Sequence, residues 1–308
     1  MDELKKIFAF SVSFAAAFSA GVMLSDMNNI KKEEYTIRNQ RIEKPVRFVF
    51  LSDLHNREFG DGNDYLVAKV DEAKPDFVVI GGDFVTAKFV YSIDSLDDVI
   101  KRLICKYPVY FAIGNHESRL KWEHKTGKLN YDSLLNHLKS MGVKVLDNDS
   151  AYLKEYNISL YGLTLPKAFF SKKNEFELSR HCVESLINIS KDDSYKILLA
   201  HSPEFFDMYK RLGVNLVLSG HMHGGIMRLP GGKGLIGPRF KLFPDDCWGT
   251  RKENATRLIV SRGLAMHTVP IRFLNPSEIT VITLKGRKKT SALIKDLSRK
   301  FIDLLPKK

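Results

Sequence analysis

The chain has 308 residues, of which 44% are hydrophobic and 27% are charged. This composition excludes bulk disorder and allows one large α/β domain or two small ones. The formal net charge of +12 favours anionic partners, such as phosphorylated substrates, membrane surfaces or nucleic acid, without selecting one of them. Three widely separated cysteines without a CxxC pair argue against a disulfide framework and against a zinc ribbon.

The first 25 residues are predicted to be a membrane anchor or a signal peptide. Residues 7–24 carry no charge and are just long enough to span the hydrocarbon core of a bilayer. Small residues cluster at 17–21 and leave a cleaved signal peptide as the alternative, but the apolar run is longer than the core of such a peptide usually is. We therefore expect a single-pass anchor, with Lys5 and Lys6 on the cytoplasmic side and the rest of the chain outside the cytoplasm.

Strands and helices are predicted to alternate after a polar stretch at 26–45, which is itself a linker or an edge strand. Apolar runs of strand length predict strands at residues 47–55, 76–84, 109–114, 195–200, 216–219, 257–261 and 279–284, with two shorter strands within 143–164. Helical spacing of apolar residues predicts helices at residues 64–73, 95–106, 132–141 and 177–189. Repeated β-α-β units predict an α/β fold with a largely parallel sheet covered by helices.

The last residues, 286–308, differ in composition from residues 46–285, which we assign to one folded domain. Lysine and arginine outnumber acidic residues in this tail, and one helical face collects the apolar residues Leu293, Ile294, Leu297, Phe301, Leu304 and Leu305. A basic amphipathic helix of this kind binds an anionic membrane surface or docks on its own domain, and the sequence leaves both open.

Seven side chains of metal-ligand type follow five of the predicted strands. They are Asp53, His55, Asp83, Asn115, His201, His221 and His223. Open α/β sheets build their sites at the C-terminal ends of their strands, so we expect these side chains to meet. Nitrogen and oxygen donors without thiolates argue against structural zinc and fit a catalytic pair of manganese, iron or zinc ions. Such a pair activates a bridging hydroxide and binds phosphoryl oxygens, which favours phosphate ester cleavage.

Three glycines lie directly beside the ligands in the sequence. Gly82 precedes Asp83, Gly114 precedes Asn115, and Gly220 precedes His221. Because glycine adopts backbone conformations that other residues avoid, we expect all three to let the chain turn sharply at the site.

The order of these motifs resembles that of the calcineurin-like metallophosphoesterase superfamily. The motifs that carry the resemblance are DLH (53–55), GD (82–83), GNHE (114–117), a lone His201 and GHMH (220–223), within about residues 46–284. The resemblance implies a four-layer αββα sandwich with mixed sheets and a dinuclear centre at its rim. One ion is then bound by Asp53, His55, Asp83 and His223. The other is bound by Asp83, Asn115, His201 and His221, with Asp83 bridging both.

The resemblance also implies roles for two residues that are not ligands. His116 corresponds to the histidine that donates a proton to the leaving oxygen or stabilises the transition state, and Glu117 supports the ligands from behind. Phe84 follows Asp83, where the serine/threonine protein phosphatases have an Asp-Arg-Gly continuation. That branch of the superfamily is therefore not expected.

The segment that follows GHMH is similar to a bacterial branch of membrane-associated phosphodiesterases, some of which cleave the pyrophosphate of a UDP-linked lipid sugar. The similarity lies in GHMHGGIMRLP, GPRF and LIVSRGLAMHTVPIRF. Arg228, Arg239, Arg262 and Arg272 are candidates for phosphate contact, with surface salt bridges as the alternative. His267 lies in the same segment and is a further candidate for substrate contact.

The sequence therefore predicts a membrane-anchored, dinuclear, metal-dependent hydrolase that cleaves phosphodiester or pyrophosphate bonds. A lipid-linked or cell-envelope substrate is a hypothesis that rests on the anchor and the basic tail; otherwise the substrate is a phosphorylated small molecule. The alternatives are a phosphomonoesterase or nuclease of the same fold and a non-catalytic metal-binding scaffold. The complete ligand set argues against the scaffold, and the lack of basic stripes interleaved with aromatic residues argues against nucleic acid. The sequence does not define an oligomeric state.

Overall fold

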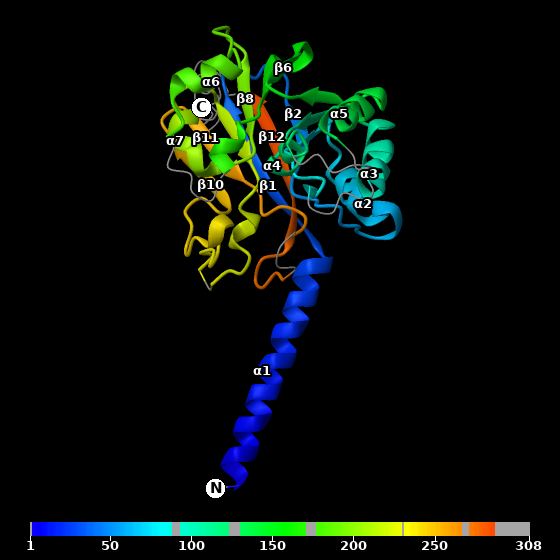
Figure 1. The fold of residues 1–308 in the computed structure, drawn as a ribbon, viewed down its shortest axis with the longest axis vertical. Helices are drawn as coiled ribbons and strands as arrows, with labels where there is room; N and C mark the ends of the chain where they lie inside the picture. Colours follow the sequence, from blue (N-terminus) through cyan, green and yellow to red (C-terminus); the bar gives the residue numbers. More distant parts are fainter. Residues whose placement is uncertain are drawn as a thin grey trace, which may run out of the picture.

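The computed structural model describes residues 2–87, 93–122, 130–170, 177–229, 231–266 and 271–286. Two six-stranded sheets lie face to face in this part of the chain, and helices cover their outer faces (Figure 1). The four-layer αββα sandwich with mixed sheets is thus confirmed.

The first sheet has the strand order β1-β12-β2-β3-β4-β5. Its strands are β1 (Ile30–Asn39), β2 (Val46–Leu51), β3 (Phe77–Ile80), β4 (Val109–Ala112), β5 (Lys144–Leu146) and β12 (Ser277–Gly286). Neighbouring strands are parallel except for β12 and β2. The C-terminal ends of β2, β3 and β4 therefore lie at the same edge.

The second sheet has the order β10-β11-β9-β8-β7-β6. Its strands are β6 (Asp149–Leu153), β7 (Ile158–Leu163), β8 (Tyr195–Ala200), β9 (Leu216–Ser219), β10 (Gly249–Glu253) and β11 (Thr256–Val260). The outer pairs β10–β11 and β6–β7 are antiparallel, and the inner pairs are parallel. The C-terminal ends of β8 and β9 consequently share an edge as well.

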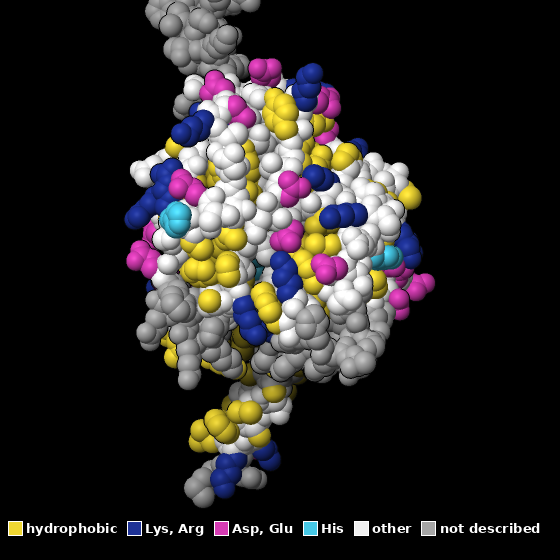
Figure 2. Space-filling model, turned by 45° about the horizontal axis from the view of Figure 1, so that its top comes forward, with side chains coloured by type: hydrophobic (Ala, Val, Ile, Leu, Met, Phe, Trp, Pro, Cys, Tyr) yellow, Lys and Arg dark blue, Asp and Glu magenta, His cyan; other side chains and the backbone are white. Residues whose placement is uncertain are grey.

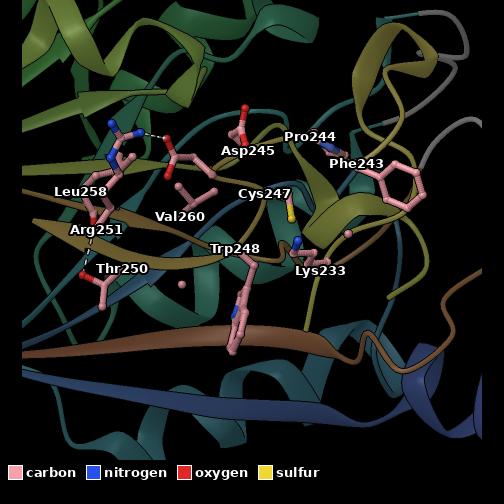
Figure 3. A pocket seen from close by; sticks show the side chains of 13 residues that line it. Lys233, Phe243, Pro244, Asp245, Cys247, Trp248, Thr250, Arg251, Leu258 and Val260 are labelled. Carbon is pink, nitrogen blue, oxygen red and sulfur yellow. Dashed lines mark hydrogen bonds and ion pairs between the residues drawn. The ribbon is translucent and has the colours of Figure 1, made fainter. Parts of the chain in front are cut away.

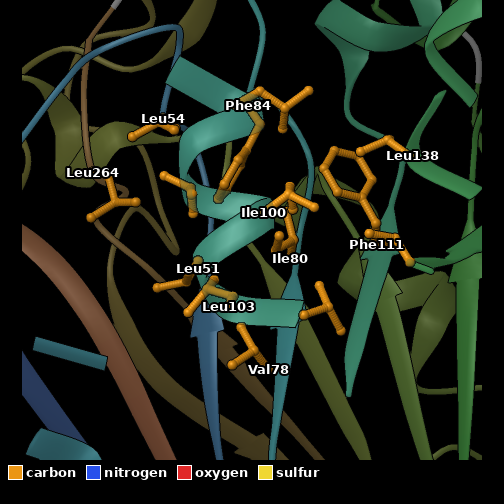
Figure 4. Close-up of a cluster of buried hydrophobic side chains, with 14 of the residues drawn as sticks. Leu51, Leu54, Val78, Ile80, Phe84, Ile100, Leu103, Phe111, Leu138 and Leu264 are labelled. Atoms are coloured by element: carbon orange, nitrogen blue, oxygen red, sulfur yellow. The ribbon is translucent and has the colours of Figure 1, made fainter. Parts of the chain in front are cut away.

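Strand β2 shows why two apolar cores form on its two sides. Phe48 and Phe50 point between the sheets, where Phe48 stacks on Phe77 with ring centroids 4.8 Å apart. Val49 and Leu51 alternate with them and pack on the other face, in the cluster that Figure 4 shows. A strand buried on both faces needs a continuous apolar sequence, which is why β2 could be predicted.

Helices from the connections complete the outer layers. Residues of α2 (Asp64–Ala73), α3 (Asp94–Ile104) and α5 (Tyr131–Ser140) belong to the apolar core on the outer face of the first sheet. Residues of α6 (Arg180–Leu186) and α7 (Phe206–Tyr209) belong to the core outside the second sheet. The short helix α4 (Asn115–Arg119) begins directly after β4 and carries two of the predicted site residues.

Most predicted elements are present, and α2, β8 and β9 have the predicted bounds. Residues 143–164 hold three strands where two were predicted, because Asn157 as well as Asn148 turns the chain with a positive φ. Strand β10 was not predicted, since its side chains are largely exposed and show no apolar alternation. Of the two interpretations of residues 26–45, the edge strand is present, because β1 pairs with β12.

Helix α1 (Asp2–Asn28) leaves the sandwich at one end (Figure 1). It is long and apolar enough to cross a membrane, and its apolar stretch is not buried against the rest of the protein. Apolar side chains are visible along it in Figure 2. The N-terminal segment is thus an apolar helix, either a signal sequence or a single anchor. The predicted basic tail lies outside the described residues, which end at Gly286.

Candidate metal centre

The seven predicted ligands come from the C-terminal ends of strands in both sheets. The first sheet supplies Asp53 and His55 after β2, Asp83 after β3, and Asn115 after β4. The second sheet supplies His201 after β8, and His221 and His223 after β9. All of them are buried except His221, which is partly exposed. Two strand edges therefore meet to form one site, as the sequence pattern predicts.

Two carboxylates lie among the imidazole rings. Asp83 Oδ2 is 3.0 Å from His201 Nε2 and 4.0 Å from His55 Nε2. Asp53 Oδ1 is 3.7 Å from His201 Nε2, 3.9 Å from His55 Nε2 and 3.8 Å from His223 Nε2. Ligand atoms gather within 4.8 Å of one another in one group of Asp53, His55 and His223 and in another of Asp83, His201 and His221. Buried clusters of this composition are typical of a site for two metal ions.

In three of the histidines, the Nδ1 atom lies within hydrogen-bond distance of an oxygen atom of the protein. His201 Nδ1 lies 2.8 Å from the Gly81 carbonyl, and His223 Nδ1 lies 2.9 Å from the Ala265 carbonyl. His55 Nδ1 lies 3.3 Å from the Thr86 hydroxyl. A ring that donates its Nδ1–H to a carbonyl has its Nε2 lone pair directed into the site, as a metal-binding histidine requires.

The amide of Asn115 gives a further test of whether a cation fits the site. Its side-chain amide faces Asp83 Oδ2 at 3.2 Å and His221 Nδ1 at 2.8 Å. In the protein alone the NH2 group donates to both atoms, and with the amide turned over its oxygen joins them as a third donor of lone pairs to a cation. The donor set therefore fits a metal ion.

Five of the seven ligands have a left-handed backbone conformation. Their φ angles are 58° at Asp53, 50° at His55, 55° at Asp83, 67° at His221 and 48° at His223. Non-glycine residues in sparsely populated conformations cost on the order of 1–3 kcal/mol each and cluster at functional sites. The chain thus holds these side chains in place against its own backbone preference.

The three glycines beside the ligands serve two different purposes. Gly82 has a φ of 91° and so needs the freedom that only glycine has. Gly114 has a φ of −89°, and a Cβ there would lie 2.2 Å from Asp83 Oδ1. A Cβ at Gly220 would lie 2.0 Å from the Ser52 hydroxyl. The prediction of a sharp turn is therefore correct for Gly82, whereas the other two glycines provide space.

The buried carboxylate of Glu117 supports two of the ligand loops. Its oxygens accept hydrogen bonds from the backbone N–H groups of Asp83 and Phe84 at 2.8 Å and of Val85 at 3.1 Å. The N–H of Gly114 donates to the same carboxylate at 3.0 Å. Burial raises the pKa of Glu117 to about 7, and the charge of Asp83 acts in the same direction. One side chain thus fixes the loops after β3 and β4 relative to each other.

The pKa values of the buried carboxylates and histidines in the centre depend on one another's charges. Burial raises the pKa of Asp53 to about 6. Burial acts in the same direction on Asp83, but the charge and the hydrogen bond of His201 outweigh it and hold the pKa of Asp83 well below its usual range. Burial alone would lower the pKa of His201, but the nearby carboxylate of Asp83 raises it to about 10. In the protein alone His201 is the cation that balances the carboxylates, and a bound metal ion would take over that charge.

The ring of His116 lies within 4.8 Å of the ligand atoms of His55 and Asp83. The backbone N–H of Ala87 donates to its Nδ1 at 3.2 Å. The proton of the neutral ring must then be on Nε2, so this nitrogen is a hydrogen-bond donor and has no lone pair for a metal. The Nε2–H of His116 is accordingly a hydrogen-bond donor beside the predicted ligands.

The four arginines differ in what they contact. Arg262 is 2% exposed and donates to Glu278 at 2.6 Å, and Arg272 is 0% exposed and donates to backbone carbonyls. Their predicted contact with phosphate is therefore replaced by contacts within the protein. Arg228 is partly buried and stacks on Trp248 at 4.0 Å. The side chain of Arg239 and all of His267 lie outside the described residues.

Two residues that support the His223 loop were not recognised in this role from the sequence. Arg272 Nη2 donates to the Ala265 carbonyl at 3.0 Å, which is the same oxygen that holds His223. Asn275 Nδ2 donates to the backbone carbonyls of His223 at 2.7 Å and Ile226 at 3.0 Å. Both contacts are to backbone atoms, for which the sequence has no signal.

A cavity of about 290 Å³ lies beside strands β10 and β11 (Figure 3). Trp248 lies in its wall, and the guanidinium groups of Arg228 and Arg262 lie 4.0 Å and 4.9 Å from the centre of its ring. None of the seven predicted ligands is among its lining residues. The cavity is therefore distinct from the space among the ligands.

Comparison with known proteins identifies the family. Residues 46–225 match the model of the calcineurin-like phosphoesterases. The chain belongs to this family. It is a metallophosphoesterase with a buried His/Asp metal-binding cluster.

Bacterial proteins are similar over most of the chain. An uncharacterized metallophosphoesterase of Bacillus subtilis, YkuE, is 28% identical over 83% of this chain and 86% of its own length. The phosphodiesterase YaeI of Escherichia coli is 27% identical over 65% of this chain and 67% of its own length. The solved structure of a phosphopantetheinyl hydrolase from Mycobacterium tuberculosis aligns with a TM-score of 0.43 at 14% identity, over 75% of this chain and 96% of that one.

The contacts of Glu117 predict that Glu117→Gln lowers the stability of the metal-stripped protein. The new amide group would place N–H groups against backbone N–H donors, and we expect a loss of at least about 2 kcal/mol in the free energy of unfolding. Unfolding of the full chain by guanidinium in detergent measures this free energy. The pH is about 8, where the carboxyl group of Glu117 in the native protein is ionised.

Glu184→Gln is the matched control, since Glu184 pairs with Arg180 on the exposed side of α6. We expect this change to alter stability by no more than about 0.5 kcal/mol. Equal unfolding free energies for the two variants would contradict the role given to Glu117.

Proposed function

We propose that the chain is a dinuclear phosphoesterase that cleaves phosphodiester or pyrophosphate bonds. The observation that carries the proposal is the position of Asp83, whose Oδ2 lies 3.0 Å from His201 of one sheet and 4.0 Å from His55 of the other. A carboxylate shared in this way suits the bridging position between two ions. One ion would be held by Asp53, His55, Asp83 and His223, and the other by Asp83, Asn115, His201 and His221.

Manganese, iron and zinc ions all accept this mixture of imidazole, carboxylate and amide ligands. When bound, two ions about 3.5–4 Å apart supply an activated water and a positive charge for the phosphoryl oxygens. The protein supplies the positions of the ligands, which the carbonyls of Gly81 and Ala265 fix through His201 and His223. Burial of the ligands excludes bulk water and strengthens every charge interaction within the site.

His116 is the residue that we assign to stabilising the leaving group. The Ala87 N–H fixes its Nδ1 as an acceptor, so the proton on Nε2 is available to an oxygen bound among the ligands. This N–H would donate a hydrogen bond to the leaving oxygen and stabilise the negative charge that develops there as its bond to phosphorus breaks. Asp83 Oδ1 accepts from the backbone N–H of His116 at 2.7 Å and holds the residue next to the ligands.

A diester or pyrophosphate substrate with a lipid-linked or cell-envelope portion is the preferred class. The Escherichia coli relative named as a phosphodiesterase supports the bond type. Helix α1 supports a membrane location, as does a zebrafish relative named a transmembrane protein with a metallophosphoesterase domain, 30% identical over 78% of this chain and 53% of its own length. We place the catalytic domain outside the cytoplasm, with a single span and Lys5 and Lys6 inside.

His116→Ala should leave both metal ions bound and slow turnover by about 10²–10⁴-fold, because it removes a hydrogen-bond donor to the leaving oxygen and no ligand. Metal content by mass spectrometry and the turnover number on a soluble diester measure the two effects. His181→Ala, at an exposed position of α6, is the control and should leave turnover unchanged. Turnover by the His116 variant at the native rate would refute the assigned role.

The class of reaction is tested by returning metal ions to the stripped full-length protein. We expect Mn²⁺, Zn²⁺ or Fe²⁺ to restore hydrolysis of bis-p-nitrophenyl phosphate or a UDP-linked lipid sugar more effectively than hydrolysis of p-nitrophenyl phosphate. Asp83→Ala, treated in the same way, should recover neither the ions nor the activity, because it removes the shared ligand. Protein that binds two ions and hydrolyses none of the three substrates would contradict the proposal.

A further inference from the structure

Outside α1, most of the large apolar side chains that are exposed in the described residues lie on two loop segments next to the metal centre. They are Leu229, Phe240, Leu242, Phe243, Ile271 and Leu274, which we call the apolar rim. Phe240 and Leu242 are 65% and 63% exposed. Exposed apolar clusters of this kind mark interaction surfaces, because water is a poor solvent for them.

Hydrogen bonds join both segments of the apolar rim to the metal centre. The backbone N–H of Arg228 donates to the Phe273 carbonyl at 3.0 Å, so the two segments lie side by side. Asn275 Nδ2 donates to the carbonyl of His223, one of the predicted ligands, at 2.7 Å. The apolar rim and the metal ligands therefore belong to the same end of the sandwich.

The same end also carries helix α1. The N–H of Asn275 donates to Asp26 Oδ2 at 2.8 Å, and Arg57 Nη2 donates to Asn28 Oδ1 at 3.0 Å. Figure 1 shows the loops of residues 225–245, in yellow, at the end of the sandwich from which α1 leaves. α1 is helical to Asn28 and β1 begins at Ile30, so no linker separates the helix from the sandwich.

The length of this connection brings the rim close to any bilayer that α1 spans. The apolar run ends at Leu24, four residues before the end of the helix. At 1.5 Å per residue these four residues extend about 6 Å, which is about the thickness of one headgroup layer. A bilayer around α1 would therefore reach the loops at this end of the domain.

The charge of the longer segment, residues 224–243, is suited to anionic lipid. Residues 224–243 contain Arg228, Lys233, Arg239 and Lys241 and no acidic residue. The end of the domain opposite α1, which comes forward in Figure 2, instead carries lysine, arginine, aspartate and glutamate interspersed. Basic residues among exposed apolar ones are the composition of a surface that lies in the headgroup region of an anionic membrane.

We propose that the apolar rim rests in the outer layer of the bilayer that α1 spans, so that the metal centre opens toward the membrane surface. The bilayer is the occupant that fits, because α1 holds it against this end of the domain and because the rim is basic as well as apolar. With the proposed phosphoesterase activity, the substrate class becomes an amphiphile whose phosphoester lies at the level of the headgroups. The surface itself does not depend on that activity.

The test places a fluorophore on the rim of the full-length chain in nanodiscs of phosphatidylcholine and phosphatidylglycerol, with one chain per disc. Leu242→Cys is labelled with an environment-sensitive dye in a background in which Cys105, Cys182 and Cys247 are replaced by alanine. The control is Tyr152→Cys, which is 59% exposed on β6 and pairs with Ser159 near the start of β7, away from the metal centre.

Lipids with a nitroxide near the top of the acyl chain should quench the dye at residue 242 and not at residue 152. Aqueous iodide should quench it at residue 152 and much less at residue 242. One chain per disc excludes a second copy as the cause, and intact mass confirms that α1 is present. Strong quenching by iodide at both positions, with none by the nitroxide lipid, would overturn the proposal, as would loss of α1 by processing. The readout needs no turnover, so it separates this proposal from the proposed activity.

Discussion

The hydrogen bonds of Asp83 determine how the two sheets meet at the metal centre. Its carbonyl accepts from the N–H of His55 at 3.0 Å, and its own N–H donates to Glu117 at 2.8 Å. Its carboxylate accepts from the N–H of His116 at 2.7 Å and lies 3.0 Å from His201 of the second sheet. Three loops of one sheet and one loop of the other are thus joined at a single residue. Catalysis on phosphate tolerates little error in such positions, since a displacement of about 1 Å is enough to slow a reaction by about 10²-fold.

The centre is costly for the protein to maintain without metal ions. Buried carboxylates such as Asp53 have lost their hydration, and five ligands hold a left-handed backbone conformation. The apolar cores on both sides of the first sheet offset this cost, with strand β2 contributing to each. Ion binding would also stabilise the folded chain, because the unfolded chain does not hold the ligands together. The site is therefore best understood as a cation-binding site built into a rigid scaffold.

That the seven predicted ligands meet at one site could be expected from the sequence, because each follows an apolar run and a buried strand has a recognisable composition. The supporting atoms could not be predicted, because the N–H of Ala87 and the carbonyl of Ala265 look like any other backbone group in a sequence. The sequence likewise could not tell the arginines apart. Arg262 and Arg228 carry the same charge, but Arg262 is buried against Glu278. Strand β10 was missed for a related reason, because exposed edge strands have no apolar pattern.

The central claim is that Asp83 is shared by two ions, and anomalous X-ray scattering from crystals of the full chain grown with Mn²⁺ tests it most directly. The account predicts two peaks. One should be bounded by Asp53, His55 and His223, and the other by Asn115, His201 and His221, with Asp83 in contact with both. A single peak, or two peaks of which only one contacts Asp83, would contradict the account.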